Sequence, residues 1–126
     1  LRYLSRGSDI CILSYGVIMK YAHRVAKKLV EEGKSVSLIS AHTLKPLDRK
    51  NIENALKTHK KVLVIEEHVP EGGLSSKTKQ IAWDIKAACE LHCFTLKDAF
   101  IHKYGNHDDL LAEHGINVTD ILNRIR

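Results

Sequence analysis

Two carboxylates and a histidine follow one of the clearest apolar runs of the chain, at 62–65, and a Pro/Gly turn then leads into a predicted helix. An unbroken apolar run of this length predicts a strand covered on both faces. In open α/β sheets, ligands and partners gather at the carboxyl ends of such strands. We therefore expect a site-facing or interface loop at this point. Its candidate residues are Glu66, Glu67, His68, Gly72 and Gly73.

The spacing of these residues along the chain limits the reactions that the loop could catalyse. Glu66 and Glu67 are adjacent, so on an extended strand they point to opposite faces and cannot work as a general acid and base pair. One carboxylate is expected to meet a partner domain while the other accepts backbone donors. His68 titrates near neutrality and could contact a ligand, but no Ser or Cys nucleophile signature stands beside it. We therefore assign no catalytic residue.

The glycines before the predicted helix allow two interpretations. The stretch Gly72-Gly73-Leu74-Ser75-Ser76 would place free backbone N–H groups and a helix dipole where an anion could bind. It is neither a dinucleotide fingerprint nor a P-loop. The structural alternative is a tight turn with positive φ, in which Ser75 or Ser76 simply caps the helix. Both interpretations stay open from the sequence.

The three cysteines form an odd set without a CxxC pair. Cys11 lies within an apolar run and is expected to be a small core residue. Cys89 and Cys93 flank His92, which suggests a metal site, but zinc prefers tighter or paired spacings. If the helix ends near Glu90, Cys89 and Cys93 would also not lie one helical turn apart, as two ligands on one helix face must. We therefore expect no metal ligands in the chain.

Composition indicates one ordinary globular domain spanning residues 1–126. Hydrophobic residues make up 44% and charged residues 28% of the chain. The net charge of +5 comes from short lysine pairs beside glutamates, without interleaved aromatics, so no nucleic-acid partner is expected. No run could span a bilayer and no secretory signal is present, so we expect a cytoplasmic protein and no membrane partner. Without an initiator methionine, the chain is expected to be part of a longer one.

Apolar periodicity alternates between strand-like and helix-like along the chain, which predicts βαβ units with parallel strands. Right-handed crossovers place helices on both faces, so the expected fold is a three-layer α/β/α sandwich. Arg2–Leu4 could add an edge strand. The predicted strands are 10–13, 36–39, 62–65 and 93–96, and the predicted helices are 17–32, a short one capped by Asp48, 74–88, 108–113 and 118–126.

In this order, the motifs resemble the C-terminal domain of transketolase-like, thiamine-diphosphate-dependent enzymes. The resemblance covers residues from about 8 to 126. It rests on the opening strand and glycine at 9–16, the T-x-K-P-L-D stretch at 43–48, the E-E-H…G-G stretch at 66–76, and a closing D-x-F…G…L…G-I…I pattern from Asp98 to Ile121. Ser75 stands where the family commonly has glycine.

The resemblance implies a mixed, mostly parallel five-stranded sheet whose first, edge strand, residues 2–5, runs antiparallel. It also implies a homodimeric parent enzyme with two further domains that hold thiamine diphosphate and magnesium. The third domain supports the dimer and binds neither group, so this domain alone should be inactive. The parent would transfer a two-carbon ketol unit between sugar phosphates.

Related reactions also fit the resemblance. Deoxyxylulose phosphate synthase condenses pyruvate with an aldehyde, and the β subunits of 2-oxoacid dehydrogenases share the domain. The Glu67-His68 pair with Gly72-Gly73 fits transketolase and the synthase better than the dehydrogenase subunits. A rival of another class is a free-standing α/β module that binds an anionic ligand at the Gly72-Gly73 helix start.

Overall fold

The computed structural model describes residues 2–41, 49–66, 73–95 and 118–125. Strands and helices alternate through most of these ranges. The strands are β1 (Arg2–Ser5), β2 (Ile10–Ser14), β3 (Val36–Ser40), β4 (Lys61–Glu66) and β5 (Glu90–Thr95). The helices are η1 (Gly16–Ile18), α1 (Met19–Glu31), α2 (Arg49–Thr58), α3 (Leu74–Asp84) and α6 (Val118–Ile125).

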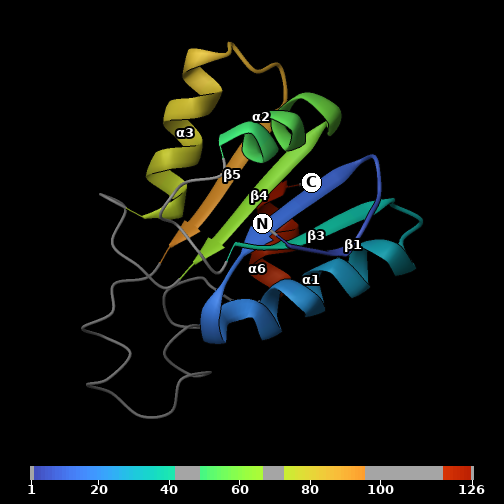
Figure 1. The fold of residues 1–126 in the computed structure, drawn as a ribbon. Helices are drawn as coiled ribbons and strands as arrows, with labels where there is room; N and C mark the ends of the chain where they lie inside the picture. The colour runs from blue at the N-terminus through green and yellow to red at the C-terminus, as the bar shows by residue number, and fades with distance from the viewer. Residues whose placement is uncertain (1, 42–48, 67–72, 96–117, 126) are drawn as a thin grey trace, which may run out of the picture.

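The five strands form one mixed sheet in the order β1-β3-β2-β4-β5 (Figure 1). β1 pairs antiparallel with β3, and the other neighbours are parallel. The prediction of a five-stranded, mostly parallel sheet with an antiparallel edge strand is confirmed. After β3 the chain crosses to the far side of β2 to form β4, so the strand order reverses between β2 and β4. Such switch points are where α/β sheets bind ligands.

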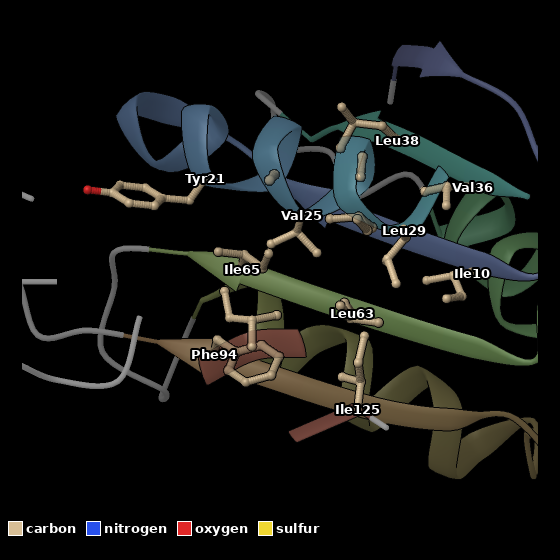
Figure 2. Packing of buried hydrophobic residues seen from close by; sticks show 14 of the residues in the cluster. Ile10, Tyr21, Val25, Leu29, Val36, Leu38, Leu63, Ile65, Phe94 and Ile125 are labelled. Atoms are coloured by element: carbon tan, nitrogen blue, oxygen red, sulfur yellow. The ribbon is translucent and has the colours of Figure 1, made fainter. Parts of the chain in front are cut away.

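Helices cover both faces of the sheet, which completes the predicted three layers. On one face, α1 and α6 pack on alternate residues of the central strands; Figure 2 shows Val25 and Leu29 of α1 over Ile10, Leu63 and Ile65. On the other face, α2 and α3 cover a second cluster that includes Cys11. Full burial of each aliphatic side chain contributes about 1.5–3 kcal/mol. These two apolar layers hold the strand ends in place.

The sequence places the first helix correctly because its apolar spacing is regular. Tyr21, Ala22, Val25, Ala26 and Leu29 are buried on one face of α1. The helix ends before Gly33, whose φ of +87° is the left-handed conformation that glycine adopts at helix ends. No helix in the described ranges is long and apolar enough to cross a membrane.

Two predicted boundaries were wrong near the second half of the sheet. The helix predicted for 74–88 ends at Asp84, because Lys86 adopts a positive φ of 53° and turns the chain. Ala88, expected to face inward, is exposed. β5 begins at Glu90, three residues before the predicted strand. The predictions for 43–48, including the Asp48 cap, and for 99–113 lie outside the described residues.

Candidate functional site

The last residue of β4, Glu66, is a fully buried carboxylate. Its Oε1 accepts a hydrogen bond from the Ser75 N–H at 2.7 Å, and its Oε2 accepts one from the Leu74 N–H at 2.9 Å. These donors belong to the first turn of α3, where backbone N–H groups have no partner within the helix. A negative charge is favoured there by the helix dipole. Glu66 therefore joins the end of β4 to the start of α3.

A tyrosine from the neighbouring strand completes the site. Tyr15 follows the last residue of β2 and donates its hydroxyl hydrogen bond to Glu66 Oε2 at 2.9 Å. Ser14, at the end of β2, is fully buried and donates to the Ile65 carbonyl at 2.6 Å. Ser14 and Ile65 are partners in the parallel register of β2 and β4. The site thus lies at the switch point between these two strands.

Further polar groups lie on the α3 side of this carboxylate. Ser75 and Thr78 are buried, and neither hydroxyl has a hydrogen-bond partner of ordinary geometry within the described residues. Burial raises the pKa of the Cys93 thiol, and the nearby Glu66 carboxylate raises it further. The Ser75 hydroxyl and the Lys79 ammonium lower this pKa, but burial is the largest effect. Cys93 is therefore a protonated thiol near neutral pH, not an activated nucleophile.

The structure corrects the predictions for the start of this helix. The N-cap is Gly73, with an extended backbone (φ −92°), so no positive φ is required there. Ser75 and Ser76 lie inside the first turn of the helix, so neither is the N-cap, and the N-cap Gly73 has no side chain that could accept a hydrogen bond. Of the predicted site residues, Glu66 is the acceptor of this network, and Gly73 directly precedes the Leu74 N–H group that Glu66 binds. Glu67, His68 and Gly72 lie outside the described residues.

This arrangement restricts what the helix start can bind. Two of its N–H groups are already occupied by a carboxylate of the same chain. An incoming phosphate would compete with Glu66 and would meet its negative charge. The network is therefore suited to fixing geometry: it clamps the two ends of the segment 67–72, which carries the other predicted residues.

The cysteines do not form a cluster of metal ligands. His92 and Cys93 are consecutive on β5, so their side chains point to opposite faces of the sheet. In the part of the chain that the structure describes, no three His, Cys, Asp or Glu side chains converge. Cys11 is fully buried, as predicted, and burial, with Cys89 nearby, raises the pKa of its thiol to about 12.

Sequence reasoning missed Tyr15 and the pairing role of Ser14. Both residues stand just past a buried apolar run, as Glu66 does. This shared position was the available signal, because two parallel neighbours of equal register bring their strand ends together. The contact itself joins residues 51 positions apart and depends on the strand order.

Comparison with known proteins gives a consistent result. The family model "Transketolase, C-terminal domain" matches residues 1–121. A 1-deoxy-D-xylulose-5-phosphate synthase of Geobacillus sp. (strain WCH70) is 31% identical over 124 residues, covering 98% of this chain and 20% of the relative. The synthase of Bacillus velezensis is 32% identical over 124 residues, covering 98% and 19%. The chain therefore spans about a fifth of the length of the curated relatives that it matches.

A solved structure shows the same fold. The chain is similar to a split-gene transketolase, described as an inactive beta4 tetramer, with a TM-score of 0.82. The two are 24% identical, and the match covers 98% of this chain and 40% of the other.

Proposed function

The chain belongs to the transketolase C-terminal domain family, and from this membership we propose that it supports a larger enzyme that transfers a two-carbon ketol unit between sugar phosphates. In this proposal residues 1–126 form one domain of a longer, homodimeric, cytoplasmic enzyme. The domain stabilises the dimer and positions a loop beside the active site. It performs no chemical step by itself.

The observation that carries this proposal is the Glu66 clamp. By accepting the Leu74 and Ser75 N–H groups, Glu66 fixes the start of α3 against the end of β4. The described chain thus leaves β4 at Glu66 and resumes at Gly73, before α3, beside the switch point of the strand order. Glu67 and His68 begin the segment 67–72, and Gly72 ends it. We propose that they face the partner domain or the active site of the parent.

The proposed cofactors, thiamine diphosphate and magnesium, belong to other domains of the parent. Two observations on the described residues support this assignment. Two N–H groups at the start of α3 are held by Glu66, and no cluster of three metal-ligating side chains is found where the structure describes the chain. In this proposal no chemical step takes place on this domain.

A second candidate follows from the relatives. Proteins such as those of Geobacillus and Bacillus velezensis carry the name 1-deoxy-D-xylulose-5-phosphate synthase. The parent of this chain would then form that sugar phosphate, with the two-carbon unit derived from pyruvate. The proposed role of the domain is the same in both reactions. Supplying the purified parent with pyruvate or with a ketose phosphate as the two-carbon donor distinguishes them.

The rival function, a free-standing module for an anion at Gly72-Gly73, has less support. Its binding groups would include the two N–H groups that Glu66 occupies. A ligand would have to displace a buried carboxylate, and that exchange leaves a charge without partners.

Substitutions in the enzyme that carries this chain test the proposal. We expect Glu67→Ala and His68→Ala to lower kcat/KM at least tenfold, or to shift the dimer–monomer equilibrium in sedimentation. Glu53→Ala is a matched control, because Glu53 forms an exposed pair with Arg49 on α2. If Glu67→Ala and His68→Ala both leave turnover and assembly at the control level, the proposed role of the loop is wrong.

A further inference from the structure

A shallow groove runs along the outer side of α3, away from the Glu66 clamp. It has a volume of about 570 Å³, which is within the range of small-molecule sites. Figure 1 shows α3 beside β5, the edge strand that borders this groove. The lining residues are Lys79, Ala82, Trp83, Lys86, Ala87 and Leu91.

The groove contains an exposed aromatic side chain that is not part of the buried core. Trp83 is the single tryptophan of the chain, and 84% of it is exposed. The other exposed large apolar residues of the described ranges, Leu4 and Val30, reach 41% and 58%. Large exposed aromatics in a groove commonly mark binding surfaces. An open indole face of this kind can stack with a planar ring.

Two lysines flank the tryptophan, and none of the described residues that line the groove is acidic. Lys79 lies four residues before Trp83, one turn away on α3, and Lys86 lies just past the end of this helix; both line the groove with Trp83. The nearest acids along the chain are already paired: Asp84 with Arg49 and Glu90 with Lys61. The charge around the groove is therefore complementary to an anion.

Lys86 occupies a conformation that favours glycine. Its φ is +53°, just past the end of α3, and it is the non-glycine residue with positive φ among those described. Glycine is the usual residue at this position. A lysine there is held at a cost in backbone energy, and such outliers cluster at functional sites. The side chain thus placed borders the groove beside Trp83.

We propose that this groove binds an anionic ligand with a planar ring, of the nucleoside-phosphate class, by stacking on Trp83 and by ion pairing with Lys79 and Lys86. Ala82, Ala87 and Leu91 form the apolar floor under the ring. Stacking on an aromatic side chain contributes roughly tenfold or more in affinity. Each exposed lysine adds about threefold. The site is separate from the proposed function of the domain and stands without it.

The test uses three probes that separate ring from charge: adenosine 5′-monophosphate, adenosine and inorganic phosphate. Each is titrated into the 15N-labelled 126-residue chain, and the single Trp83 indole N–H signal is followed by NMR. We expect the monophosphate to shift this signal saturably, with an affinity at least tenfold above that of either other probe. No saturable shift, or equal binding of phosphate alone, would overturn the proposal.

Variants assign the binding to the groove. We expect Lys79→Ala and Lys86→Gly to weaken binding about threefold each, and Trp83→Leu, followed at backbone amides, to weaken it about tenfold. Lys86→Gly relieves the strained backbone, so lost binding cannot be ascribed to lost folding. Lys27→Ala, an exposed lysine on α1, is the matched control. Equal effects of Lys27→Ala and Lys86→Gly would overturn the assignment.

Discussion

Removing the buried carboxylate of Glu66 should destabilise the fold far more than removing an exposed one. Glu66→Gln keeps the shape but replaces one acceptor oxygen with an amide donor, so at least one of the three hydrogen bonds is lost. An unsatisfied buried N–H costs about 1–3 kcal/mol, and the lost interaction with the α3 dipole adds about 0.3–1 kcal/mol. We therefore expect a loss of about 1.3–4 kcal/mol in the free energy of unfolding, from these two contributions.

Glu66→Ala removes all three acceptor contacts and leaves a cavity. We expect a loss of about 3–5 kcal/mol, as for a buried pair that loses one partner. Both values come from urea unfolding of the 126-residue chain, followed by far-UV circular dichroism. The matched control is Glu53→Gln, whose exposed pair with Arg49 spans 3.0 Å and should change stability little, because solvent screens it.

Tyr15→Phe shows whether the network acts as a unit. It deletes the hydroxyl that donates to Glu66 Oε2, and in combination with Glu66→Gln it forms a double-mutant cycle. We expect a coupling energy of about 1 kcal/mol, typical of contacting residues. The proposed role of Glu66 would be refuted if the free energy of unfolding of Glu66→Gln lay within about 0.5 kcal/mol of the wild-type value. It would also be refuted if the effects of the two substitutions were additive.

Three further predictions concern other parts of the fold. Burial raises the pKa of the Cys11 thiol from 9.0 to about 12, so the unfolded chain loses this proton first and stability falls as pH rises above 9. The loss reaches about 1.4 kcal/mol at pH 10. The difference in free energy of unfolding between the wild type and Cys11→Ala should therefore become smaller as pH rises above 9; a difference that stays constant with pH would contradict this. Lys86→Gly should stabilise the chain by about 0.5–1 kcal/mol in urea unfolding, because glycine relieves the left-handed backbone at some cost in entropy; a loss would show that the side chain supports the fold. Gly7→Ala should destabilise it by about 3 kcal/mol, because the added Cβ would lie 2.3 Å from the Val36 backbone nitrogen; an unchanged melting temperature would refute that packing.

The sheet was predictable because its central strands are buried on both faces. Runs such as 10–13 and 62–65 are unbroken and apolar, and a short run of this kind is typical of a strand buried on both faces. The antiparallel edge at β1 was different: its four residues carry no pattern, and it was predicted through the family resemblance. The order of the strands in the sheet was not predicted, since periodicity does not reveal which strands are neighbours.

The boundaries around α3 were not predictable from apolar spacing. The helix stops where Lys86 turns left-handed, and the sequence offers no glycine there as a signal. β5 begins with an exposed glutamate, because an edge strand carries polar residues that a central strand does not. Local pattern alone favoured a longer helix and a shorter strand.

For the site, the sequence predicted the place but not the partners. Adjacent carboxylates after a strand indicate that only one can point to a given face, and the fold shows that Glu66 caps α3. Its contact with Tyr15 depends on β2 and β4 being neighbours. The roles of Glu67, His68 and Gly72 remain predictions.

The most direct test of the supporting role is isothermal titration of the 126-residue chain with thiamine diphosphate plus magnesium, and separately with ribose 5-phosphate. Far-UV circular dichroism of the same sample verifies that the chain is folded. The account predicts no binding heat with either, because Glu66 holds the N–H groups at the start of α3. Saturable micromolar binding of either ligand would contradict it and would make the helix start a ligand site.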